Sequence, residues 1–183
     1  MHPDIADILF SKDDIKLRIA MMGRQISADY KDVSLLLVGI LKGSAIFLAD
    51  ILREIDADVN YDFVSISSYC GDTSSSGIVR VIKDVDADIS GKHVLIVEDI
   101  VDTGWTLRLS YLKENLLTRG AESVKVCALL DKPSRRKVEV NIDYIGFVID
   151  DLFVVGYGLD YDGRYRNLPY IGVLKPEVYN RNN

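Results

Sequence analysis

Three carboxylates stand within five residues of one another, at Glu98, Asp99 and Asp102. They follow the apolar run at residues 94–97, which is typical of a parallel strand covered on both faces. Carboxylates beside a low-dielectric core are costly unless cations, hydrogen-bond donors or water meet them. Capping of the next helix by Asp102 or Thr103 would explain one acid. It leaves Glu98 and Asp99 unexplained, which favours a site that uses the negative charge.

The residues after these acids predict an anion cradle. Thr103, Gly104 and Thr106 stand where a helix should start, and the free backbone N–H groups of a helix start attract anions. Glycine lets the chain approach a phosphate closely. The spacing matches neither a GxxxxGK[ST] loop nor a GxGxxG dinucleotide turn. A sugar phosphate bound with Mg²⁺ is the ligand that fits best, with the acids facing a polyhydroxylated or cationic group.

The elements that must position this segment alternate between strands and helices. Ser11 and Asp14 predict a capping box for a first helix, and residues 35–38 and 48–55 predict a strand and a second helix. The most regular unit is the strand at 94–97, a helix with Trp105, Leu109, Leu112 and Leu116 on one face, and a buried strand at 124–130. This order predicts an α/β fold, a mainly parallel twisted sheet flanked by helices, with ligands at the carboxyl ends of the strands.

Two regions outside this unit carry no helix signal. Strand patterns at residues 59–69 and 78–82 flank a small polar stretch and predict a long hairpin. Residues 138–149 and 153–174 are rich in β-formers and glycine, and we expect them to form a short antiparallel or hood-like appendage.

Composition limits the class of protein. The 183 residues suit one domain, and the net charge of −6 argues against nucleic-acid and membrane partners. Cys70 and Cys127 form no CxxC pair, and with only His2 and His93 a histidine-based triad is disfavoured. The absence of a signal-like start or a long apolar run predicts a soluble, cytoplasmic protein.

The run VLIVEDIVDTGWTL at residues 94–107 resembles the phosphoribosyl-pyrophosphate signature of type I phosphoribosyltransferases. Further matches are Leu41-Lys42-Gly43-Ser44, Ser68-Tyr69, Leu130-Asp131-Lys132-Pro133, residues 153–161 and Arg166. Together they resemble the hypoxanthine (guanine) phosphoribosyltransferases from about Leu9 to Pro176. The resemblance implies the type I phosphoribosyltransferase fold as a single domain over residues 1–183, with a flap at about 66–82 and a small hood subdomain from the N-terminal and C-terminal segments.

The resemblance also implies roles for single residues in Mg²⁺-dependent transfer of phosphoribose from phosphoribosyl pyrophosphate to a 6-oxopurine base. Asp102 is the expected general base for the purine N7 proton. The expected phosphoribosyl and 5′-phosphate residues are Glu98, Asp99, Asp102, Thr103, Gly104, Trp105 and Thr106. Those expected for pyrophosphate are Lys42, Gly43, Ser68, Tyr69 and Arg166, those for the purine are Lys132, Phe153, Val154 and Asp160, and those for Mg²⁺ are Glu98, Asp99 and Asp160.

Some of these residues have plainer interpretations. Taken alone, Lys132 is more often a solvated strand end, Phe153 a core residue and Arg166 a solvated surface residue. Trp105 and Asp150 depart from the family pattern, since relatives commonly have a smaller residue and a proline there. Members of the family can carry a non-proline cis bond in the Leu-Lys-Gly segment, and they are commonly homodimers or homotetramers.

Two other classes of protein use related features. An RNA-binding attenuator on the same fold would need a basic face, which the acidic composition disfavours. A phospho-acceptor receiver domain places its acid pair after the first strand, whereas Glu98 and Asp99 lie in the middle of this chain.

Overall fold

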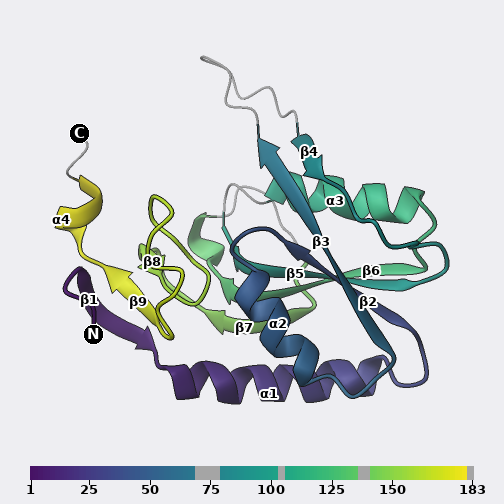
Figure 1. Cartoon of the computed structure of the whole chain (residues 1–183), viewed down its shortest axis with the longest axis horizontal. Coiled ribbons are helices and arrows are strands. Elements are labelled where there is room, and N and C mark those ends of the chain that lie inside the picture. The colour runs from purple at the N-terminus through teal and green to yellow at the C-terminus, as the bar shows by residue number, and fades with distance from the viewer. Residues whose placement is uncertain (69–78, 103–105, 136–140, 181–183) are drawn as a thin grey trace.

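The computed structural model describes residues 1–68, 79–102, 106–135 and 141–180 (Figure 1). Its main sheet has six strands in the order β4-β3-β2-β5-β6-β7. The strands are β2 (Leu35–Ile40), β3 (Val59–Ser68), β4 (Val79–Lys83), β5 (His93–Val101), β6 (Ser123–Asp131) and β7 (Tyr144–Val148). Neighbouring strands pair in parallel, except that β4 runs antiparallel to β3. The predicted mainly parallel sheet is confirmed.

Helices cover both faces of this sheet. Those on one face are α1 (Lys12–Asp29) and α2 (Ala45–Arg53), and α3 (Thr106–Thr118) packs on the other. Along β5, Leu95 and Val97 join the core under α1 and α2, whereas Val94 and Ile96 join the core under α3. Because successive side chains of a strand point to opposite faces, a strand covered on both sides must be apolar at every position.

The start of α1 is the predicted capping box. The backbone N–H of Asp14 donates to the Ser11 Oγ at 3.2 Å, and the Ser11 N–H donates to the Asp14 carboxylate at 2.9 Å. Two hydrogen bonds to the Asp14 carboxylate, from the Ser11 hydroxyl at 2.5 Å and from the Ser11 N–H, hold the pKa of Asp14 below its ordinary value. The helix therefore begins where local hydrogen bonding satisfies its first N–H groups.

A second, three-stranded antiparallel sheet lies beside the main one, and we call it the hood (Figure 1). Its strands are β1 (Ile5–Phe10), β9 (Ile171–Leu174) and β8 (Val154–Val155), in that order, and the short helix α4 (Pro176–Tyr179) follows β9. It therefore combines N-terminal and C-terminal segments. A one-turn 3₁₀ helix, η1 (Pro133–Arg135), follows β6.

One assignment from the sequence is wrong. Residues 138–149 were expected in the antiparallel appendage, but β7 pairs in parallel with β6 and forms an edge of the main sheet. The reason is packing: the ring of Phe147 stacks on Phe10 with centroids 3.9 Å apart, and Tyr144 is buried in the α1 side of the core. Turn-rich composition alone could not indicate this long-range pairing.

Cys127 is buried in the core, and burial raises the pKa of its thiol. Cys70 lies outside the described residues, as does the tip of the predicted flap. Within the described part of the chain, no helix is both long and apolar enough to cross a membrane.

Candidate active site

A pocket of about 230 Å³ lies where the carboxyl ends of β5 and β6 face the hood. Asp99, Ile100 and Asp102 come from the end of β5, and Lys132 directly follows β6. The other lining residues are Leu152, Phe153, Val154, Leu159 and Asp160, which belong to β8 and its flanking loops. The pocket thus joins the predicted purine residues to Asp99 and Asp102, two of the three acids predicted at the end of β5.

Asp99 is the most deeply placed acid of this lining. Its residue is only 7% exposed, and burial raises the pKa of its carboxyl group to about 6. A 3.0 Å hydrogen bond from the Ile100 N–H and the positive charge of Arg166 lower that pKa, while the negative charge of Asp160 raises it. Asp99, Asp160 and Arg166 therefore form one electrostatic group.

The loop after β2 packs directly against this acid. An ideal Cβ on Gly43 would lie 1.7 Å from the Asp99 Oδ2, so only glycine fits there. The peptide bond between Leu41 and Lys42 is cis, as members of the family can show. On its other side, an added Cβ on Gly158 would lie 2.2 Å from the Gly43 carbonyl oxygen, and Gly158 has a φ of +101°. The Lys42–Gly43 loop is thus in close contact with the Asp99 carboxylate through Gly43, and with the hood through Gly158.

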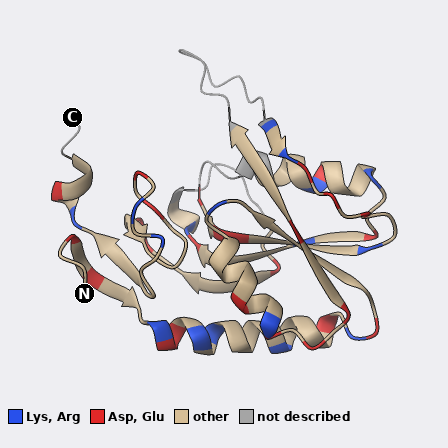
Figure 2. Ribbon diagram, viewed as in Figure 1, with Lys and Arg blue, Asp and Glu red and all other residues tan. Residues whose placement is uncertain are grey.

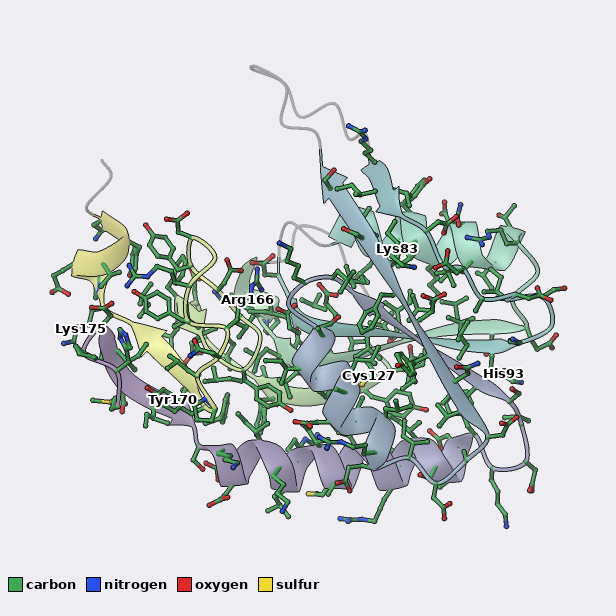
Figure 3. All side chains as sticks on the ribbon, viewed as in Figure 1. Lys83, His93, Cys127, Arg166, Tyr170 and Lys175 are labelled. Atoms are coloured by element: carbon green, nitrogen blue, oxygen red, sulfur yellow. The ribbon has the colours of Figure 1, made fainter. Side chains whose placement is uncertain are left out.

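Arg166 completes this group from the hood side. Its Nη1 donates to the Gly158 carbonyl oxygen at 2.6 Å, and its Nη2 lies 2.5 Å from the Asp160 Oδ1. The second oxygen of Asp160 accepts from the Gly163 N–H at 2.8 Å. Figure 3 shows Arg166 between the hood and the main sheet. The guanidinium is a fixed cation beside two carboxylates, not a freely solvated side chain.

Lys132 also differs from a solvated strand end. The residue is 7% exposed, and its Nζ donates to the Leu152 carbonyl oxygen at 2.7 Å and lies 3.3 Å from the Asp151 Oδ1. A buried ammonium group held by the residues next to Phe153 can donate a further hydrogen bond into the pocket. This placement agrees with the expected contact to a purine 6-oxo group.

Phe153 is not a core residue, because it is 39% exposed while its neighbour Val154 is buried. The Phe153 carbonyl oxygen accepts from the Leu174 N–H at 2.8 Å, which fixes the backbone of Phe153 to β9. An exposed aromatic ring on a fixed backbone, lining the same pocket as Ile100 and Lys132, is suited to stack on a flat base.

The other two predicted acids differ in exposure. Asp102 lines the pocket and is half-buried, so its carboxylate can reach a ligand. Glu98 is fully buried, and it is not among the described residues that line the pocket. Its expected role in ribose binding stays a prediction.

Part of the predicted phosphate cradle cannot be placed. Thr103, Gly104 and Trp105 lie outside the described residues, and so does Tyr69 of the flap. Thr106 is the first residue of α3 and Ser68 is the last residue of β3, and only their backbones are described. Asp150 is exposed, and its carbonyl oxygen accepts from the Leu152 N–H at 2.8 Å, which closes a tight turn in the purine-side loop.

The acids of this site fit a Mg²⁺ ion that is completed by substrate. The described residues contain no group of three or more acids, histidines or cysteines close enough to enclose a metal. Mg²⁺ is, however, commonly bound by one or two carboxylates together with water and substrate phosphate. Asp99 and Asp160 supply two such carboxylates, because both line this pocket.

Sequence reasoning missed several residues of this pocket. Ile100, Leu152 and Leu159 supply its apolar lining. Gly158 was quoted in the sequence match, but its close approach to Gly43 was not expected. The two glycines that flank Tyr157 were the available signal, since both adopt a positive φ.

Charge distribution bears on the RNA-binding alternative. In the view of Figure 2, Lys and Arg alternate with Asp and Glu along the described ribbon. The helix α1 shows this clearly, with residues of both signs along its length. This mixture does not form the basic face that an attenuator would need.

Comparison with known proteins agrees with the geometry. A family model of the phosphoribosyl transferase domain matches residues 6–162, which makes this chain a phosphoribosyltransferase by class. The chain is 49% identical over 179 residues to the hypoxanthine-guanine phosphoribosyltransferase of Bacillus subtilis, and the match covers 98% of both chains. A crystal structure of a hypoxanthine phosphoribosyltransferase from Staphylococcus aureus superposes with a TM-score of 0.92 at 49% identity, covering 98% of this chain and 96% of that one. The chain belongs to the hypoxanthine-guanine phosphoribosyltransferase family.

Some relatives are much longer. The bifunctional protein TilS/HprT of Listeria monocytogenes is 50% identical over 98% of this chain, and the chain spans 27% of its length.

Proposed function

We propose that this protein transfers 5-phosphoribose from phosphoribosyl pyrophosphate to hypoxanthine and to guanine in a Mg²⁺-dependent reaction, as a purine salvage enzyme. The products are the nucleoside monophosphates IMP and GMP, and pyrophosphate. The observation that carries the proposal is that one pocket joins Lys132 and Phe153 to Asp99, Asp102 and Asp160. Residues suited to a purine base and residues suited to a phosphoribosyl group thus line the same small space.

The purine end is recognised by charge and by stacking. The Lys132 ammonium donates a hydrogen bond to the 6-oxo group, and the Phe153 ring stacks on the base opposite Ile100. An ammonium group has no acceptor, so it cannot pair with the 6-amino group of adenine. Hypoxanthine, guanine and xanthine present the same oxygen to Lys132 and differ only at position 2.

The reaction exchanges one bond at the ribose for another. The bond from C1′ to the pyrophosphate oxygen breaks, the electron pair leaves with pyrophosphate, and a bond forms between C1′ and the purine nitrogen. Asp102 accepts the N7 proton of the base, which leaves the product neutral at the ring. The carboxylates of Asp99 and Asp102 stabilise the positive charge that develops on the ribose during this exchange.

The pyrophosphate end is held by the loop of Lys42 and Gly43 and by Arg166. The guanidinium of Arg166 is already oriented by Gly158 and Asp160, so little conformational entropy is lost when it binds a phosphate. Asp99 and Asp160 would hold Mg²⁺, which when bound neutralises charge on the departing pyrophosphate. The predicted cradle at residues 103–106 and the flap residues Ser68 and Tyr69 belong to the same proposal.

A steady-state assay with four bases tests this function. Purified protein is supplied with phosphoribosyl pyrophosphate and hypoxanthine, guanine, xanthine or adenine, with Mg²⁺ or with EDTA. We expect nucleotide from hypoxanthine and guanine only when Mg²⁺ is present, and none from adenine. The assignment would be refuted if neither hypoxanthine nor guanine gave nucleotide in the presence of Mg²⁺.

The same proposal includes a cytoplasmic homodimer or homotetramer. These properties follow from the sequence and from the resemblance to the family. Light scattering on the purified full chain measures the oligomeric state, and a monomeric mass at assay concentration would contradict that part of the proposal.

A further inference from the structure

The ring of Phe153 contacts two aromatic side chains of the hood. Tyr179 of α4 stacks on it with centroids 4.8 Å apart and planes 17° apart. Tyr161 meets it nearly at a right angle, at 5.5 Å and 85°. Stacked and edge-to-face arrangements at these distances are the favoured geometries of aromatic pairs. The three rings form a cluster that we call the aromatic shelf: Phe153, Tyr161 and Tyr179.

The two faces of the Phe153 ring have different surroundings. Phe153 lines the pocket together with Ile100 and Lys132, whereas Tyr179 is not among the described residues that line it. Figure 1 shows α4 at the outer end of the hood, away from the carboxyl ends of β5 and β6. Because Tyr179 stacks on Phe153 without lining the pocket, we take the other face of the ring as the one left for a base.

The backbone fixes both partners of this stack to one strand. The Leu174 N–H of β9 donates to the Phe153 carbonyl oxygen at 2.8 Å, and α4 begins two residues after Leu174. The Lys175 N–H donates to the Asp4 carbonyl oxygen at 2.9 Å, which anchors the start of α4 to the N-terminal segment. Val178 and Tyr179 also pack against the buried hood cluster around Ile5 and Leu174. The position of Tyr179 relative to Phe153 is thus set when the hood folds.

The geometry points to Tyr179 as a positioning residue for the 6-oxopurine base, acting through the ring of Phe153. This inference rests on the proposed function, because it assumes that the base stacks on Phe153. A phenyl ring that is 39% exposed has freedom to turn, and ordering such a side chain at the moment of binding weakens affinity. A second ring behind it removes that freedom before the base arrives. Tyr179 should therefore affect purine binding and leave phosphoribosyl pyrophosphate binding unchanged.

The test compares Tyr179→Leu, which removes the aromatic ring, with Tyr179→Phe, which keeps it. Steady-state kinetics give kcat and the KM for each substrate, and calorimetry gives the Kd for IMP without turnover. For Tyr179→Leu we expect the hypoxanthine KM and the IMP Kd to rise about 3- to 10-fold, the size of a lost aromatic pair. The KM for phosphoribosyl pyrophosphate should stay within about 2-fold of the wild-type value. Tyr179→Phe, which keeps the ring, should have the wild-type hypoxanthine KM and IMP Kd.

A matched control makes the same change at another aromatic pair. Tyr61 of β3 is 51% exposed and contacts Phe63 edge to face at 6.1 Å, near the amino end of the sheet. Tyr61→Leu should leave both KM values as in the wild type. If Tyr61→Leu raised the purine KM as much as Tyr179→Leu does, the rise would come from general destabilisation of the protein. The inference about Tyr179 would then be wrong.

A double-mutant cycle separates positioning from a structural effect. If Tyr179 acts through Phe153, then Tyr179→Leu should have no further effect on the purine KM in a Phe153→Leu background. Independent, multiplying effects of the two changes would overturn the inference. So would equal rises in both substrate KM values, or a lower purine KM, which would mean that Tyr179 competes with the base for the Phe153 ring.

The outcomes also distinguish this inference from the proposed function. If the wild type forms nucleotide from hypoxanthine but Tyr179→Leu has wild-type kinetics, only the role of Tyr179 is lost. If the wild type forms no nucleotide from either 6-oxopurine, the proposed function fails and the role of Tyr179 fails with it. If Tyr179→Leu does not fold, Tyr179→Met replaces it in the wild-type and Phe153→Leu backgrounds, and a folded Tyr179→Met variant with the wild-type purine KM overturns the inference.

Discussion

The main sheet and the hood supply different kinds of residue to the same pocket. Asp99 and Lys132 of the main sheet are charged and almost fully buried, while Phe153 of the hood is apolar and over a third exposed. A buried charge is expensive, so its hydrogen bonds must be provided by rigid neighbours. An exposed ring has no charge to desolvate, so a position next to a short strand is sufficient to hold it. The comparison teaches that the site takes its most deeply buried charges from the main sheet and its exposed ring from the hood.

The two parts also differ in how the backbone is held. The strands β5 and β6 lie in the centre of a parallel sheet, with neighbours on both sides. In the hood, the residues after β8 adopt unusual backbone angles, with positive φ at Tyr157, Asp162 and Tyr165 as well as at three glycines. Such turns bring Asp160 and Arg166 together without a regular element. Changes at the charged residues of the sheet should therefore have larger effects on the reaction than changes at the exposed rings of the hood.

The largest expected effect is the loss of the proposed base in Asp102→Asn. The amide keeps the size of the side chain but cannot accept the N7 proton, so we expect kcat to fall about 10²- to 10⁴-fold. The KM values should change much less, because the group acts in the transition state. Steady-state kinetics with hypoxanthine measure both. Asp88→Asn, at an exposed aspartate before β5, is the control, and an unchanged kcat in Asp102→Asn would remove the proposed role.

A smaller effect is expected for the buried lysine of the sheet. Lys132→Met removes a charge-assisted hydrogen bond to the 6-oxo group, which should raise the hypoxanthine KM about 10- to 150-fold. The matched control is Lys125→Met, because Lys125 lies on the same strand β6 at its amino end, over the rings of Tyr30 and Tyr144. Lys125→Met should keep the wild-type KM. If both variants raised the hypoxanthine KM equally, the base would not be bound specifically at the carboxyl end of β6, where Lys132 lies.

The cost of burying Asp99 should be measurable as a pH effect on stability. Its folded-state pKa of about 6 lies above the ordinary value of 3.8, because burial disfavours the charged form. The stabilising contribution of the protonated carboxyl is thus fully present below about pH 4 and is lost as the pH rises through 6. Two pKa units correspond to about 3 kcal/mol. Metal-free Asp99→Asn has no such group, so its free energy of unfolding relative to wild type should rise by up to about 3 kcal/mol between pH 4 and pH 7.

Urea unfolding in EDTA at the two pH values gives this difference directly. EDTA is needed because a bound cation would stabilise the charged carboxylate and hide the cost of its burial. A difference between variant and wild type that is the same at both pH values would show that Asp99 is not a costly buried acid. The contrast between sheet and hood would then lose its energetic basis.

The parts that sequence could predict are those governed by local rules. The apolar run at residues 94–97 identified β5, because these four residues are buried on both faces of the sheet. Ser11 and Asp14 located the start of α1 because a capping box is made by residues three apart. The acids at the end of β5 were found because carboxylates next to a buried strand are costly unless they have binding partners. In each case neighbouring residues carry the whole signal.

The parts that sequence could not predict depend on contacts between distant segments. The strand β7 joins the main sheet through β6 and through the stack of Phe147 on Phe10, which no local pattern indicates. The contact of Tyr179 with Phe153 and the approach of Gly158 to Gly43 are likewise visible only after folding. The role of Thr103, Gly104 and Trp105 remains a prediction from the resemblance.

The smallest expected effect concerns Ser11, which joins β1 of the hood to α1 under the main sheet. Ser11→Ala removes the side-chain half of the capping box and should lower the free energy of unfolding by about 1 kcal/mol. The hypoxanthine KM should not change, since the stack of Phe10 on Phe147 holds the hood against the sheet independently of the cap. Ser90→Ala, at an exposed serine, is the control. A raised KM in Ser11→Ala alone would mean that the chain connection, and not side-chain packing, sets the position of the hood over the pocket.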